Sequence, residues 1–160
     1  MFRAYAQGNG EAAMPQNHEH FMHRALYEAH LSGEAVGRPV GAVIVCDGEV
    51  EGRSGHRHET LTDPTAHAEV LAIRDAARNL GRVDLSGCTL YTTLEPCPMC
   101  SGAIIVSKVS TVVVGASHTP EERRAEPVLS MLGWDKENEL VSDILAKECM
   151  AVREEWAANP

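Results

Sequence analysis

The stretches DPTAHAE (residues 63–69) and EPCPMC (residues 95–100) are the most informative part of this 160-residue sequence. They contain His67, Cys97 and Cys100, and imidazole and thiolate groups are the side chains that bind Zn²⁺ well. Three protein ligands leave the fourth position of a tetrahedral site open, which is typical of catalytic rather than structural zinc. The pattern therefore predicts one catalytic zinc ion held by these three residues.

Glu69 lies two residues after the histidine and is not needed as a ligand. Bound zinc lowers the pKa of a coordinated water towards about 7, so that hydroxide is available near neutral pH. A carboxylate beside such a water is a suitable general base and acid. We therefore predict that Glu69 is the catalytic proton carrier.

Helical segments are expected to present both halves of the pattern. Residues 63–65 (Asp-Pro-Thr) are typical of a helix start, and Gly81 marks the end of the apolar periodicity that follows. On one helix, His67 and Glu69 point about 200° apart, so both can border a site only if it lies over the helix N-terminus. The two cysteines are three residues apart and share a face in the first turn of a second helix, expected to end near Ser107.

Other interpretations of these residues exist. A single C-x-x-C pair can be a redox pair, but that would leave His67 and Glu69 without a role. A structural zinc site would need a fourth ligand, and the available histidines and cysteines do not form a second paired motif. Glu69 is a solvated helix residue in the simplest interpretation, as most helical glutamates are. We consider the catalytic interpretation the strongest because it uses all four residues.

Length and composition fit one globular domain, with 44% hydrophobic and 23% charged residues. No apolar run approaches the roughly 20 residues of a membrane span, and residues 1–16 do not resemble a signal peptide. We therefore expect a cytoplasmic protein with no membrane partner. Five cysteines suit a reducing compartment, and Cys46, Cys88 and Cys149 are interpreted as small buried hydrophobic residues.

The charge balance favours a small substrate. The chain has 23 acidic and 14 basic residues, and a formal net charge of −9. Proteins that bind nucleic acids usually present a basic stripe to the phosphates, and single strands also require aromatic stacking surfaces. Neither feature is visible in this sequence. We therefore expect a small-molecule substrate, no nucleic-acid partner and no measurable tRNA binding.

The order of helical and strand patterns predicts a mixed sheet covered by helices on both faces. Residues 1–16 are expected to be a flexible segment, and residues 17–160 a single domain. The expected helices cover residues 17–32, 63–80, 97–107, 120–131 and 142–156. The expected strands cover residues 40–46, 49–55, 89–93, 111–114 and 139–141, with a hairpin turn at 47–48.

With residues 63–69 and 89–105 taken together, the sequence resembles the cytidine deaminase superfamily of zinc-dependent deaminases. Its guanine deaminase, fungal-type cytosine deaminase and bacterial tRNA adenosine deaminase branches are the most similar. The resemblance implies a three-layer α/β/α fold with a central five-stranded mixed sheet, a homodimer and a zinc-hydroxide mechanism. It places His67, Cys97 and Cys100 at the metal positions and Glu69 at the proton-shuttle position.

One position departs from the family pattern. These branches usually carry a substrate-binding asparagine eleven residues before the histidine ligand, and this sequence has His56 there. An imidazole cannot reproduce the contacts of an amide, so His56 is either a changed substrate-binding residue or a residue at the rim of the site. Residues 117–120 resemble the start of the acidic segment of guanine deaminases, which makes His118 a second candidate for substrate binding.

These observations predict a hydrolase that deaminates a free amino-substituted nucleobase of the guanine or cytosine type, or a related heterocycle, and releases ammonia. The alternatives are a tRNA-specific adenosine deaminase and a non-catalytic zinc-binding scaffold with the same fold. An intact Glu69 speaks against the scaffold, because a protein that only binds zinc has no use for a proton carrier.

Overall fold

The computed structural model describes residues 17–35, 37–117, 129, 131, 133, 134 and 137–159. They form one five-stranded sheet in the order β2-β1-β3-β4-β5. β1 pairs antiparallel with β2 and β3, whereas the β3–β4 and β4–β5 pairs are parallel, so the sheet is mixed as predicted. The elements are α1 (His18–Glu34), β1 (Gly41–Cys46), β2 (Glu49–Gly55), α2 (His58–Leu61), α3 (Ala68–Leu80), β3 (Thr89–Leu94), α4 (Pro98–Ser107), β4 (Thr111–Ala116), β5 (Glu139–Val141) and α6 (Ala146–Ala158).

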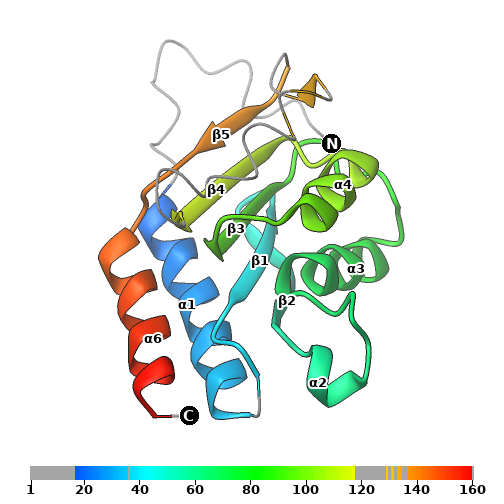
Figure 1. Cartoon of the computed structure of the whole chain (residues 1–160). Helices are drawn as coiled ribbons and strands as arrows, with labels where there is room; N and C mark the ends of the chain where they lie inside the picture. Colours follow the sequence, from blue (N-terminus) through cyan, green and yellow to red (C-terminus); the bar gives the residue numbers. More distant parts are fainter. Residues whose placement is uncertain are drawn as a thin grey trace.

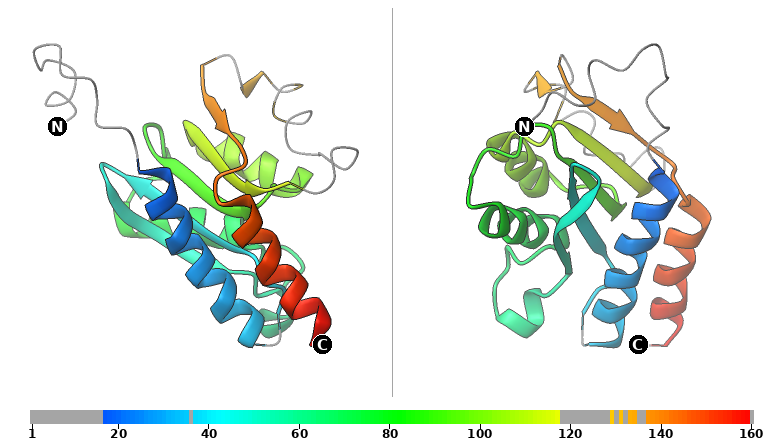
Figure 2. Two further views of the ribbon diagram at one scale, coloured as in Figure 1. Left: turned by 90° about the vertical axis from the view of Figure 1, so that its left-hand side faces the viewer. Right: turned by 180° about the vertical axis from the view of Figure 1, so that it is seen from behind.

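Helices cover both faces of this sheet, which confirms the predicted three-layer α/β/α fold. α1 and α6 lie side by side on one face, and α3 and α4 lie on the other (Figures 1 and 2). Two buried clusters correspond to these layers, because alternate residues of each strand point to opposite faces. Ile44 and Leu90 pack with α3 and α4, whereas Val43 and Tyr91 pack with α1 and α6.

Several local predictions are confirmed. Asn17 caps α1, and its side-chain oxygen accepts a hydrogen bond from the His20 backbone N–H at 3.0 Å. Asp47 and Gly48 both have positive φ, of 53° and 81°, which suits the tight turn between β1 and β2. β4 is buried along nearly its whole length, as its run of β-branched residues predicted.

The start of α3 differs from the prediction. The Asp63 carboxylate accepts hydrogen bonds from the Thr65 backbone N–H at 2.8 Å and from its hydroxyl at 2.7 Å. These bonds fold the Asp-Pro-Thr segment into a turn that precedes the helix, and α3 begins only at Ala68. The short helix α2, which the sequence did not predict, lies just before this turn. The C-terminal helix α6 likewise begins later than predicted, at Ala146.

Close packing on β2 fixes the position of α3. A Cβ atom added to Gly52 would lie 2.2 Å from the Ala72 carbonyl oxygen and 2.5 Å from the Ala76 nitrogen. Only glycine at this position lets the α3 backbone approach the strand so closely. The middle of α3 is therefore held directly against the sheet, which fixes the helix whose N-terminus carries the predicted site.

Cys46 and Cys88 form a disulfide, with their Cα atoms 4.5 Å apart. The interpretation of both as free, buried hydrophobic residues is wrong in this structure. Antiparallel pairing of β1 with β3 sets Val45 opposite Thr89, and the next residues outward are these two cysteines. Cys149 is free and buried, as predicted.

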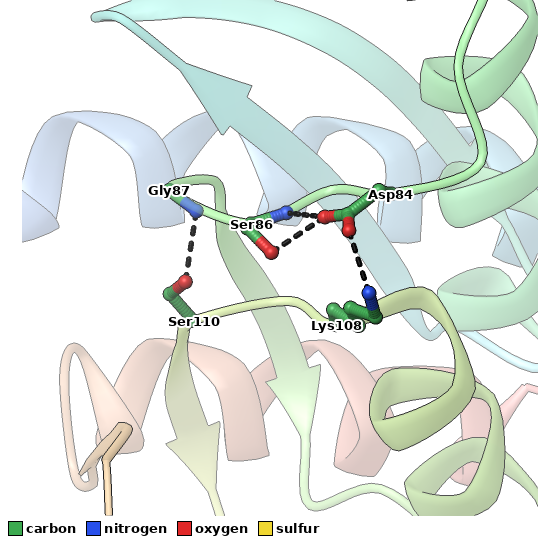
Figure 3. Close-up of polar contacts among 5 residues, drawn as sticks. All are labelled: Asp84, Ser86, Gly87, Lys108 and Ser110. Atoms are coloured by element: carbon green, nitrogen blue, oxygen red, sulfur yellow. Dashed lines mark hydrogen bonds and ion pairs between the residues drawn. The ribbon is translucent and has the colours of Figure 1, made fainter. Parts of the chain in front are cut away.

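A polar network joins the connection before β3 to the connection after α4 (Figure 3). The Lys108 ammonium lies 2.8 Å from the Asp84 carboxylate, which also accepts a bond from the Ser86 backbone N–H at 3.0 Å. The Gly87 N–H donates to the Ser110 hydroxyl at 2.8 Å. These contacts fix the C-terminal end of α4 against the loop that leads into β3.

Three predictions fall outside the described residues: the flexible segment 1–16, most of the helix 120–131, and His118. Among the residues that the structure describes, no helix is both long enough and apolar enough to cross a membrane.

Candidate zinc centre and active site

The three predicted zinc ligands come together where the N-termini of α3 and α4 meet. His67 is the residue before the first turn of α3, with extended backbone angles (φ −74°, ψ 151°). Cys97 holds the same position before α4, whose first residue is Pro98. Cys100 is buried one turn further along α4. The sequence pattern required a site over the helix N-termini, and the structure brings the three residues together there.

The distances between the ligand atoms suit a tetrahedral zinc ion. His67 Nδ1 lies 3.7 Å from Cys97 Sγ and 3.5 Å from Cys100 Sγ, and the two sulfurs are 3.5 Å apart. Zinc bonds of about 2.3 Å to sulfur and about 2.0–2.1 Å to nitrogen place tetrahedral ligand atoms about 3.6–3.8 Å apart. All three atoms are therefore already close to the positions that zinc requires, and these residues fit the ion.

The two thiols are electrostatically unequal. A hydrogen bond from Cys100, with backbone N–H bonds from Cys100 and Met99 in support, lowers the pKa of Cys97 to about 5. The same thiol–thiolate contact, together with burial, raises the pKa of Cys100. The lowered pKa favours a Cys97 thiolate at neutral pH before metal binds. Zinc binding then displaces the proton of the Cys100 thiol.

Glu69 is buried beside this group, with only 4% of its surface exposed. Its carboxylate oxygens lie 3.5 Å from Cys100 Sγ and 3.4 Å from the Thr92 hydroxyl. Burial raises the pKa of Glu69 to about 7, because the charged form is poorly solvated there. A carboxyl group with a pKa close to neutral both accepts and returns protons readily, as the predicted role requires.

The raised pKa of Glu69 predicts a pH-dependent stability of the metal-free protein. Its pKa is 4.5 unfolded and about 7 folded, so the stability that the neutral form contributes is full below pH 4.5 and is lost as the pH rises to about 7. Glu69→Gln stays neutral throughout. We therefore expect the variant to gain about 3 kcal/mol over the wild type between pH 4 and pH 8.

Urea unfolding of both proteins in the presence of a chelator, at pH 4 and pH 8, measures this difference. Comparing the two proteins cancels the contributions of the titrating groups that do not interact with Glu69. Parallel stability curves for the variant and the wild type would show that folding does not raise the pKa of Glu69.

His56 lies next to the zinc ligands rather than at an exposed rim. It directly follows β2, is 5% exposed, and its ring centroid is 4.8 Å from that of His67. Burial and the neighbouring His67 and His58 lower the pKa of His56 to about 4. The residue is therefore a neutral imidazole beside the site. Its contact with substrate stays a prediction.

The sequence did not single out two features of this region. Thr92, on β3, contacts Glu69 and also donates to the Leu94 carbonyl oxygen at 2.9 Å. The sequence feature that could have identified Thr92 is its position as a polar residue inside an apolar strand, a few residues before Cys97. His58 and Glu59, the first residues of the short helix α2, contact each other beside His56, and the sequence did not predict this helix.

Comparisons with known proteins show close relatives. The chain is 41% identical over 134 residues to the tRNA-specific adenosine deaminase of Bacillus subtilis, covering 82% of this chain and 83% of the relative. It is 48% identical over 104 residues to the guanine deaminase of the same species, covering 64% and 67%. A solved structure from a study of A-to-I editing by tRNA:A34 deaminases matches with a TM-score of 0.75 and 38% identity, covering 83% of this chain and 98% of the other.

These relatives correct two predictions. The interpretation as a deaminase of free nucleobases, and the expectation of no nucleic-acid partner, are both wrong, because relatives named tRNA-specific adenosine deaminases match this chain at 41–50% identity and a structure from a study of tRNA:A34 deaminases matches it as well. The error lies in the use of the net charge. A formal charge of −9 describes the whole chain, whereas phosphate binding depends on the cations around one surface.

The zinc-binding region has its own match. The family model described as the cytidine and deoxycytidylate deaminase zinc-binding region covers residues 15–116, which include every residue placed in the site above. Together with the fold and the ligand geometry, this match confirms the family resemblance and the zinc cofactor. The chain belongs to the zinc-dependent cytidine and deoxycytidylate deaminase family.

Proposed function

We propose that this protein is a tRNA adenosine deaminase, which converts adenosine to inosine at the wobble position of a tRNA. The match to the Bacillus subtilis tRNA-specific adenosine deaminase, at 41% identity over 82% of this chain, carries the proposal. The structural match to the tRNA:A34 deaminase study supports it. The reaction consumes one water and one adenosine and releases one ammonia.

The proposed catalytic roles follow from the geometry of the site. His67, Cys97 and Cys100 would hold the zinc ion, which when bound lowers the pKa of a coordinated water. Glu69 would take a proton from that water and return protons to the purine ring nitrogen and to the departing amino group. The burial and near-neutral pKa of Glu69 support both roles, because its carboxyl group gains or loses a proton near neutral pH with a small change in free energy.

Exposed arginines near the site support a polyanionic substrate. Arg57 directly follows His56, and Arg38 acts electrostatically on the same ring. Arg53 is 58% exposed but lies 3.8 Å from Glu28, so part of its charge is balanced. We propose that Arg38 and Arg57 contact tRNA phosphates close to the target nucleotide.

A substrate panel tests the proposed function. We expect the zinc-loaded protein to deaminate a tRNA, or an anticodon stem-loop, with adenosine at the wobble position. Ammonia release from free adenine, guanine and cytosine should be at least about 10³-fold slower in kcat/KM, because a free base lacks the phosphate and ribose contacts. The matched control is the same stem-loop with guanosine at that position. Faster turnover of a free base than of the stem-loop would contradict the proposal.

The expected homodimer and cytoplasmic location stay predictions. We propose that two copies meet along α4, where Val106 is 83% exposed and Met99 is 37% exposed. Exposed apolar side chains on one helix favour such a contact.

A further inference from the structure

A second group of titratable side chains, formed by His56, His58 and Glu59, lies next to the zinc site. His58 Nε2 is 2.9 Å from Glu59 Oε1, and His58 Nδ1 contacts His56 Nε2 directly. The His56 and His58 rings meet edge to face, with centroids 4.4 Å apart. The three side chains thus form a chain of contacts that leads from the exposed carboxylate of Glu59 to the ring beside His67.

The backbone holds the inner end of this chain in place. The His56 N–H donates to the Val40 carbonyl oxygen at 2.9 Å, and the His56 carbonyl oxygen accepts a bond from the Ser32 hydroxyl at 2.8 Å. Ser32 is itself buried. The backbone of His56 is therefore fixed, and its buried ring packs beside the rings of His58 and His67. The protonation of its two ring nitrogens decides what it offers to a ligand.

Hydrogen-bond partners assign the ring protons. A carboxylate only accepts, so a His58 ring with a single proton carries it on Nε2 and presents Nδ1 as an acceptor. His56 Nε2 faces that acceptor and must therefore carry the single proton of the His56 ring. The remaining nitrogen, His56 Nδ1, is then an acceptor. Among the residues that the structure describes, none forms a hydrogen bond with it.

We propose that Glu59 and His58 fix the tautomer of His56, and that His56 Nδ1 accepts a hydrogen bond from a donor group on the target nucleotide. This inference rests on the proposed function. The donor is either the N–H of the purine amino group or the O–H of a ribose hydroxyl. His56 is thus a specificity-determining residue, and His58 and Glu59 are positioning residues.

Kinetics of stem-loop deamination test the contact. We expect His56→Leu to lower kcat/KM by about 10- to 100-fold while keeping about one zinc per chain, because a donor on the substrate loses its only partner there. His56→Asn should recover most of this loss, since its amide oxygen also accepts. The exposed His30 on α1 provides the matched control, and His30→Leu should behave as the wild type.

A double-mutant cycle tests the positioning role. His58→Phe keeps a ring but removes the acceptor for His56 Nε2, so we expect about a 5-fold loss of kcat/KM in the wild-type background. In the His56→Asn background the same change should cost nothing, because an amide has no tautomer to fix. An equal loss in both backgrounds would show that His58 is merely structural and would overturn its positioning role.

A modified substrate identifies which group of the target nucleotide is the donor. A stem-loop with 2′-deoxyadenosine at the target position lacks one ribose hydroxyl. If that hydroxyl is the donor, His56→Leu should cost nothing further on the deoxy substrate; if the amino group is the donor, the full loss should persist.

Three further results would overturn the proposal. The first is a His56→Leu kcat/KM within twofold of the wild type. The second is loss of zinc in His56→Leu, which would make the residue a support for the metal. The third is a second zinc ion per wild-type chain that disappears in His58→Phe, which would make the group a metal site. A wild type inactive on every stem-loop would instead refute the proposed function, and this inference with it.

Discussion

Glu69→Gln is expected to lose most of its deamination activity while the protein keeps about one zinc ion per chain. The carboxyl group lies against Cys100 Sγ and the Thr92 hydroxyl, and the three proposed ligand atoms are supplied by other residues. Glutamine has nearly the same shape but neither accepts nor returns a proton. General acid–base catalysis is typically worth 10²–10⁴-fold, so we expect kcat to fall by at least about 10²-fold.

Zinc content by elemental analysis and single-turnover deamination of a tRNA stem-loop measure this prediction together. Glu154, exposed on α6, provides the matched control, and Glu154→Gln should retain full activity. Loss of zinc from Glu69→Gln would show that the carboxylate is a ligand. Retained activity would show that another group carries the proton.

Cys97→Ala and Cys100→Ala are expected to lose both the metal and the activity. Each substitution removes one of three ligands whose atoms lie 3.5–3.7 Å apart, and two ligands hold zinc weakly. Zinc stabilises only the folded state, so wild-type protein saturated at 1,000 times the dissociation constant gains about 4 kcal/mol. For a chain of this length that gain corresponds to a rise in Tm of roughly 10 °C.

Thermal unfolding with and without a chelator measures this coupling. We expect the chelator to lower the Tm of the wild type and to leave the Tm of both variants unchanged. Cys149 is the matched control because it is buried and free but lies on α6. Cys149→Ala should keep its zinc and its response to the chelator. A full zinc complement in either ligand variant would contradict the assigned ligand set.

The parts of the fold that the sequence predicted are those that short-range patterns determine. The strand pattern predicted the observed bounds of β2 and β5. A capping residue predicted the start of α1, and turn residues predicted the turn between β1 and β2. The zinc site was predictable because its three ligands and its proton carrier are specific side chains near helix N-termini. The start of α3 was not, because Asp63 uses its carboxylate in a local turn instead of capping the helix.

Long-range features were beyond the sequence patterns. The Cys46–Cys88 disulfide depends on the register between β1 and β3, which are separated by more than 40 residues, and no local signal reports that register. The contacts of His58 with His56 and Glu59 depend on the short helix α2, which no pattern in the sequence predicted. The prediction of a small-molecule substrate was wrong because the net charge includes side chains on surfaces that do not contact the substrate.

The most direct test of the central claim is the nucleoside composition of a wobble-adenosine tRNA after incubation with the zinc-loaded protein. We predict one inosine formed and one ammonia released per adenosine lost, at the wobble position alone, and inosine formation at least about 10²-fold slower with Glu69→Gln. Unchanged adenosine in the tRNA, under conditions in which the wild type binds zinc and releases ammonia from a free base, would contradict the account.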